Sequence, residues 1–136
     1  MNEPANAPGQ NTSGRDRVAG ILMLVAAAAA LFAFVTGIGV ATGSGPATQQ
    51  VEWWRELGYL MFTGIFVLLA FRPRRYPGLW ELVILDKAAL TVVEAVLVQN
   101  DATDAATTAA SDGILTVVLI AAYLLSRGYR SWWHPR

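Results

Sequence analysis

The hydrophobic residues of this chain fall into four long runs separated by short polar segments. The first covers residues 18–42 without a charged residue, and the others cover 53–71, 77–99 and 112–126, the last with a start as early as Ala105. A helix of 25 residues is about 37 Å long, enough to cross a hydrocarbon layer of about 30 Å. The first run is also too long for a signal peptide. The pattern therefore predicts four transmembrane helices.

The ends of these runs predict how the helices connect. Pro77 suits the first turn of a helix, and Ser111 with Asp112 suits a helix start, because both places leave amide groups unpaired. The connections at residues 72–76 and 100–111 are short. Short connections favour neighbouring helices that run in opposite directions. The expected fold is an all-α, antiparallel four-transmembrane-helix bundle.

Composition agrees with this fold. The chain has 136 residues, of which 54% are hydrophobic and 15% charged, which is too apolar for an ordinary soluble domain. We expect one transmembrane domain over residues 18–130. Residues 1–17 lack apolar periodicity and predict a disordered cytoplasmic tail. Residues 127–136 are rich in arginine and tryptophan and predict an anchor at the membrane interface.

The arginines predict the orientation. Only Arg55 falls in the segments expected outside, and eight others fall inside: Arg15, Arg17, Arg72, Arg74, Arg75, Arg127, Arg130 and Arg136. This asymmetry places both termini in the cytoplasm. The bias towards arginine and alanine suggests a bacterial inner membrane. An alternative role for the inner arginines is a site for anionic lipid.

The run at residues 77–99 is unusual because it carries Glu81, Asp86, Lys87 and Glu94. Near the middle of a span each charge costs about 2.5 to 3.5 kcal/mol, so we expect Asp86 and Lys87 to face protein or water. Adjacent side chains on a helix point about 100° apart, so these two are not expected to pair with each other. Lys87 is the only lysine and the first candidate for function.

Depth along the helices predicts the neighbours of Lys87. At 1.5 Å per residue, Asp86 and Lys87 lie about 14 to 15 Å from the cytoplasmic ends of the helices. Asp112, Glu56 and Glu94 lie about 21 to 25 Å from the same ends. We expect Glu94 to face Lys87, directly or through Thr91 and a water molecule, with Asp112 close by. The predicted polar cavity is lined by Glu56, Asp86, Lys87, Thr91, Glu94 and Asp112.

Two interpretations of this cavity stay open. The polar residues either fix the register of the helices through ion pairs, with Glu52, Arg55 and Glu56 solvated at the outer surface, or form a site for a small ligand, a lipid or a proton. A hard-cation site from Glu56, Glu94 and Asp112 is disfavoured by Lys87, so no metal is expected. The ligand and any cofactor cannot be named from the sequence.

Several function classes are excluded or disfavoured. The chain has no cysteine and one histidine, and no nucleophile–base motif is present, so we favour a non-enzymatic role and name no catalytic residue. The zero net charge gives no general field for nucleic acid. Expected partners are the lipid bilayer, a lipid or small-molecule ligand, and a second copy or a larger membrane complex. The alternative function is an accessory or assembly subunit of such a complex.

Small residues follow one face of the first run, where Gly39 and Gly43 form a G-x-x-x-G motif. Such motifs let helices approach closely in lipid. We expect this one to pack within the chain rather than in a dimer.

With four short helices, the basic turn RPRRYPGLW and the polar helix ILDKAALTVVEAV, the chain resembles the DoxX-like bacterial membrane proteins over residues 17–130. The bundle is also similar to that of the sigma-2-receptor type of sterol-related proteins. The resemblance implies a role in quinone-coupled oxidation, or in lipid or sterol binding. The lack of cysteine argues against a thiol-based role.

Overall fold

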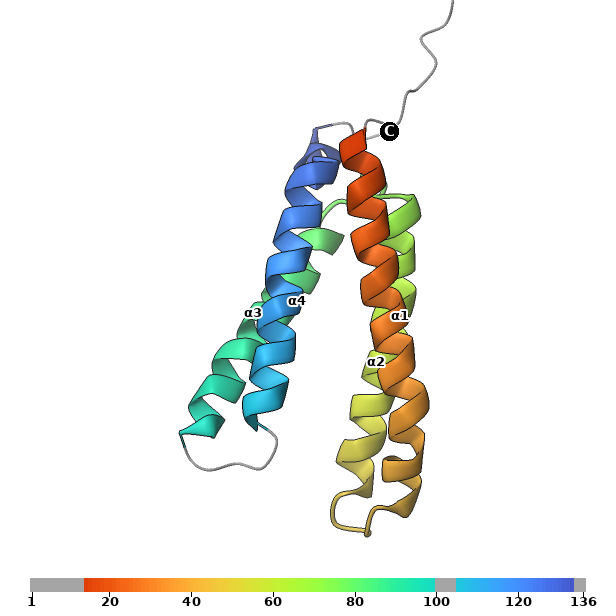
Figure 1. Cartoon of the computed structure of the whole chain (residues 1–136), viewed down its shortest axis with the longest axis vertical. Helices are drawn as coiled ribbons and strands as arrows, with labels where there is room; N and C mark the ends of the chain where they lie inside the picture. Colours follow the sequence, from red (N-terminus) through yellow and green to blue (C-terminus); the bar gives the residue numbers. More distant parts are fainter. Residues whose placement is uncertain (1–13, 100–104, 134–136) are drawn as a thin grey trace, which may run out of the picture.

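The described part of the chain forms four long helices and one short one (Figure 1). A computed structural model of the chain describes residues 14–99 and 105–133. The elements are α1 (Gly14–Gly43), α2 (Gln49–Phe71), α3 (Leu79–Val98), α4 (Ala105–Ser126) and the 3-10 helix η1 (Gly128–Trp132). The predicted all-α chain with four long helices is confirmed.

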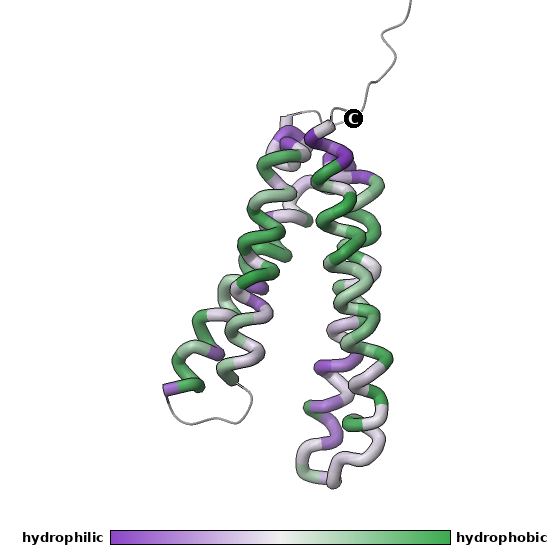
Figure 2. The backbone as a smooth tube through the Cα atoms, in the orientation of Figure 1, coloured by the Kyte–Doolittle hydropathy of each residue, from purple (hydrophilic) through white to green (hydrophobic). Residues whose placement is uncertain are grey.

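Three of these helices have the character of membrane spans. Among the described residues, α1, α2 and α4 are long and apolar enough to cross a membrane. The four charged residues of α3 set it apart, although it has 20 residues. Figure 2 shows apolar helix between polar ends, and a polar stretch part-way along the hairpin of α3 and α4. That all four helices cross a membrane as an antiparallel bundle stays a prediction.

The helices are arranged as two hairpins that meet at one end. α1 packs against α2, α3 packs against α4, and α1 also packs against α4. Figure 1 shows that the hairpins converge where α1 begins and α4 ends, and diverge towards the other end. The core occupies the convergent end and consists of Ala19, Met23, Ala26, Ala27, Phe66, Leu69, Trp80, Val83, Leu119 and Ala122. The alanines of α1 allow the close helix approach there.

The start of α1 differs from the expected boundary. Residues 14–17 were expected in a disordered tail, but α1 begins at Gly14 and Asp16 lies in its first turn. A carboxylate there interacts favourably with the helix dipole. Asp16 also forms an ion pair of 2.7 Å with Arg74. The rest of the predicted tail, residues 1–13, lies outside the described residues.

Two other helix starts also differ. α3 begins at Leu79 rather than at Pro77, because Gly78 has a φ of 83°, which interrupts the helix and favours glycine. α4 begins at Ala105, the early limit of the prediction, and the Ser111 hydroxyl donates to the Thr107 carbonyl 2.9 Å away within the helix. Asp112 therefore lies within α4 and does not cap it.

α2 begins at Gln49, four residues before the expected start, so the link from α1 is short. The G-x-x-x-G motif does not pack within the described chain as expected. A β-carbon at either Gly39 or Gly43 would have no neighbouring atom within 4 Å.

The predicted interfacial tail forms η1, which is fastened to α3 and α4. The Glu81 carboxylate accepts hydrogen bonds from the Tyr123 hydroxyl at 2.7 Å and from Trp132 Nε1 at 3.0 Å. Gly128 packs so closely that an added β-carbon would lie 2.7 Å from rings of both Trp80 and Tyr123. These contacts close the convergent end of the molecule. Residues 134–136 of the predicted tail lie outside the described part of the chain.

Candidate functional site

Lys87 is a buried ammonium where three helices face each other. The residue is 6% exposed, and its Nζ atom lies 3.6 Å from Asp112 Oδ1 on α4. The same atom lies 3.5 Å from Asp86 Oδ2 and 3.9 Å from the centroid of the Phe62 ring on α2. A cation over an aromatic face is attracted by the ring quadrupole. Lys87 is therefore held by two carboxylates and one aromatic ring.

The pair of Lys87 with Asp86 contradicts the expectation that adjacent residues would not pair. The flexible four-carbon stem of a lysine lets its ammonium reach a neighbour whose backbone direction differs by about 100°. The two aspartates differ in environment. The Asp86 side chain is 45% exposed, whereas that of Asp112 is 15% exposed. Asp112 is therefore the more strongly coupled partner of the lysine.

Two threonines support the charged residues through the backbone. The Thr91 hydroxyl donates to the Lys87 carbonyl at 2.8 Å, and the Thr116 hydroxyl donates to the Asp112 carbonyl at 2.7 Å. Each hydroxyl thus has a partner one turn back along its own helix. The ion pairs of the lysine are with the two aspartates, so its direct partner on another helix is Asp112. That Glu94 faces Lys87 through Thr91 and a water molecule stays a prediction.

Tyr59 on α2 is subject to electrostatic effects from Arg55, Glu56, Glu94 and Asp112, which belong to α2, α3 and α4. Among these acids, Asp112 forms an ion pair with Lys87. That Glu56 and Glu94 line one cavity with Lys87 stays a prediction.

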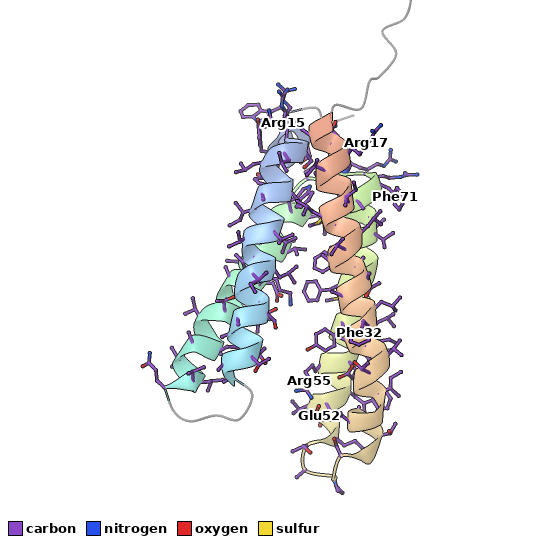
Figure 3. All side chains as sticks on the ribbon, in the orientation of Figure 1. Arg15, Arg17, Phe32, Glu52, Arg55 and Phe71 are labelled. Atoms are coloured by element: carbon purple, nitrogen blue, oxygen red, sulfur yellow. The ribbon has the colours of Figure 1, made fainter. Side chains whose placement is uncertain are left out.

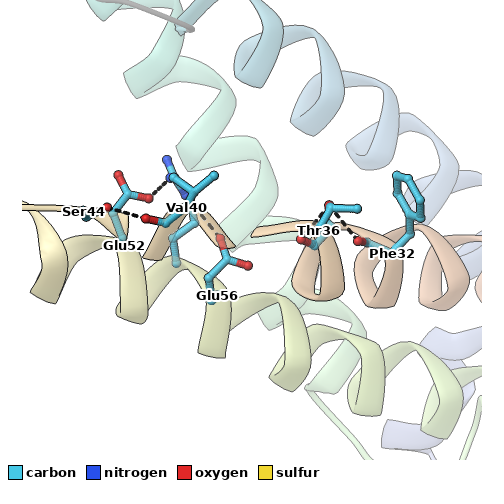
Figure 4. Close-up of polar contacts among 8 residues, drawn as sticks. Phe32, Thr36, Val40, Ser44, Glu52 and Glu56 are labelled. Carbon is cyan, nitrogen blue, oxygen red and sulfur yellow. Dashed lines mark hydrogen bonds and ion pairs between the residues drawn. The ribbon is translucent and has the colours of Figure 1, made fainter. Parts of the chain in front are cut away.

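Glu56 is buried against α1. It is 2% exposed, its Oε1 atom lies 3.8 Å from Arg55 Nε, and its Oε2 atom has no hydrogen-bond partner among the described residues. A β-carbon on Gly37 would overlap this carboxylate. Figure 4 shows Glu56 at α1, between Val40 and Thr36. The interpretation in which Glu56 is solvated is wrong for this residue, because the missing side chain of Gly37 leaves room for the carboxylate between the helices.

Arg55 matches the solvated interpretation better. Arg55 Nη2 forms an ion pair with Glu52 Oε2, and the side chains of Arg55 and Glu52 are 50% and 18% exposed. Figure 3 shows both residues towards the divergent end, opposite Arg15, Arg17 and Phe71. Surface pairs of this kind contribute little to stability.

Two residues of the site were missed in the sequence. Phe62 follows Tyr59 by three positions and so shares its helix face, a spacing that could have identified it. Gly37 was not singled out, because the G-x-x-x-G motif that begins at Gly39 was the expected packing signal of this helix. Its role depends on where Glu56 of α2 meets α1, which only the register of the hairpin determines.

Among residues 14–99 and 105–133, no group of three acidic, histidine or cysteine side chains is arranged to hold a metal ion. Comparison of the chain with protein-family models, curated proteins and solved structures found no match. The resemblance to DoxX-like proteins therefore stays a prediction.

Proposed function

We propose that this chain is a four-helix, antiparallel inner-membrane protein with both termini in the cytoplasm, and that it binds and passes protons at the site around Lys87. The observation that carries the proposal is the buried Lys87 ammonium between Asp86 and Asp112. Intramembrane ionisable residues are costly, and proton relays are among their main uses.

The balance of charge favours a proton over an anionic ligand. Lys87 is one cation beside Asp86 and Asp112, so two carboxylates face a single ammonium group. An excess of carboxylates repels an anionic ligand, and intramembrane carboxylates are typical of proton relays. Lysine, unlike arginine, is also a residue that proteins use to exchange protons.

Proton flux into vesicles tests the proposal. The purified chain is placed in liposomes containing a pH-sensitive dye, and a potassium diffusion potential drives proton entry. We expect flux above that of empty liposomes, lost in Asp112→Asn and retained in Glu52→Gln. Glu52 is the matched control because it is an acid that pairs with Arg55 on α2 and is not one of the ion-pair partners of Lys87. Flux equal to that of empty liposomes, or unchanged in Asp112→Asn, would contradict the proposal.

An accessory or assembly subunit is the second candidate, and the exposure of Asp86 favours it. Its side chain is 45% exposed halfway along α3. A carboxylate facing lipid at that depth is costly, so a partner helix or a second copy would stabilise it by covering it. An accessory subunit should be unstable alone, whereas a self-sufficient proton protein should stay folded as a monomer or homodimer in mild detergent. Size-exclusion chromatography with light scattering distinguishes the two.

A further inference from the structure

The convergent end of the molecule carries a cluster of arginines that make none of the contacts around Lys87. One hollow of about 200 Å³ there is lined by Arg15, Asp16, Arg74, Leu125 and Arg127. These residues come from the start of α1, the turn after α2, and the end of α4. A water molecule needs only about 10 to 15 Å³ of such space, so the hollow has room for a larger group.

The charge of the hollow points to an anion. Three arginines line it against one acid, Asp16, which already pairs with Arg74 at 2.7 Å. A second hollow, lined by Arg72, Pro73, Arg74 and Arg75, shares Arg74 with the first. Guanidinium groups bind phosphate oxygens through paired hydrogen bonds. The hollow therefore suits a phosphate group.

The backbone at Arg127 adds a second indication. Arg127 has φ 53° and ψ 44°, the left-handed conformation that glycine and asparagine adopt readily and arginine rarely does. The residue after it, Gly128, is fixed by its contacts with Trp80 and Tyr123. The backbone alone would thus favour glycine or asparagine at position 127, so the arginine side chain needs another explanation.

The surroundings favour a lipid over a soluble phosphate. Leu125 lines the hollow, and the nearby side chains of Val18 and Leu124 are 48% and 54% exposed. Figure 3 shows Arg15 and Arg17 where α1 begins, and Figure 2 shows apolar helix directly below this polar end of the molecule. We propose that the hollow of Arg15, Arg74 and Arg127 binds the phosphodiester headgroup of an anionic phospholipid whose chains lie along the apolar helices.

Native mass spectrometry of the full chain in mild detergent tests this site with added phosphatidylglycerol and phosphatidylcholine. We expect phosphatidylglycerol to bind at least about tenfold more tightly. Arg127→Asn and Arg15→Asn should each remove about tenfold of that affinity, as the loss of a charge-assisted hydrogen bond implies. Arg17→Asn is the matched control, since it removes the same charge from a residue outside both hollows, and should change affinity less than about twofold.

Thermal unfolding of the same variants separates binding from folding. Arg127→Asn should be at least as stable as the native chain, because asparagine accepts the left-handed conformation. Equal losses of affinity in the Arg127 and Arg17 variants would overturn the proposal and indicate general surface charge. Displacement of the lipid by equimolar inorganic phosphate would overturn it as well.

Discussion

The ion pair of Lys87 and Asp112 predicts a strong coupling between two substitutions. Lys87→Met keeps the length of the side chain and its contact with Phe62 but removes the charge. At the observed 3.6 Å, two unit charges attract by about 4 to 5 kcal/mol at an effective dielectric constant of about 20. Loss of one partner leaves Asp112, with its 15% exposed side chain, without its closest counter-charge.

Breaking a buried pair from one side costs about 3 to 5 kcal/mol, so Lys87→Met should destabilise the fold by about 3 kcal/mol. Asp112→Asn should cost less, about 1 to 2 kcal/mol, because Lys87 keeps Asp86 at 3.5 Å. The double variant has neither charge and should come within about 1 kcal/mol of the native chain, since removing both partners of a buried pair is close to neutral.

Unfolding by SDS in mixed micelles, followed by tryptophan fluorescence and circular dichroism, measures the four free energies of the cycle. The free-energy change of the double variant should be smaller than the sum of the two single changes by about 3 kcal/mol. Additive effects, with the double variant about 4 to 5 kcal/mol less stable than the native chain, would refute a direct coupling of these two residues.

Three further predictions concern the rest of the molecule. Gly128→Ala should destabilise the fold by about 1 to 3 kcal/mol, because its β-carbon would meet the Trp80 and Tyr123 rings. Gly64→Ala, in open space, should stabilise α2 by about 0.5 to 1 kcal/mol. SDS unfolding measures both changes. Glu81→Ala should release the indole of Trp132 and cost about 1.5 to 3 kcal/mol, with a red shift of tryptophan emission in detergent; an unchanged spectrum would count against the contact. Cysteines introduced at positions 74 and 131 should react with a membrane-impermeant reagent only from the inside and one at position 47 only from the outside, and labelling of position 74 from outside would overturn the orientation.

Hydropathy was sufficient to predict the helices because each apolar run has at least 15 residues, which is about four helical turns. Hydropathy predicted the first and last residues of the helices less well. Gly78 breaks the helix after Pro77 through its backbone conformation, and the alanines from Ala105 extend α4 before the apolar run begins. Local backbone preferences and not hydrophobicity determine these boundaries.

The site was predictable in part for a related reason. Depth along straight helices placed Asp112 close to Lys87 and predicted that acids from several helices converge. It could not choose between Asp112 and Glu94 as the ion-pair partner, since that depends on how each helix is rotated. The divergence of the hairpins and the burial of Glu56 against Gly37 depend on packing between distant segments, which the pattern of a single run does not contain.

The proton proposal is tested most directly by flux through the Lys87→Met/Asp112→Asn double variant. This protein should fold, because both charges of the buried Lys87–Asp112 pair are removed together and Asp86, which also loses Lys87, has a side chain that is 45% exposed. It nevertheless lacks the central pair of the site. In dye-loaded liposomes under a potassium diffusion potential, we expect the folded double variant to give no more proton flux than empty liposomes. Flux equal to that of the native chain from a folded double variant would contradict it.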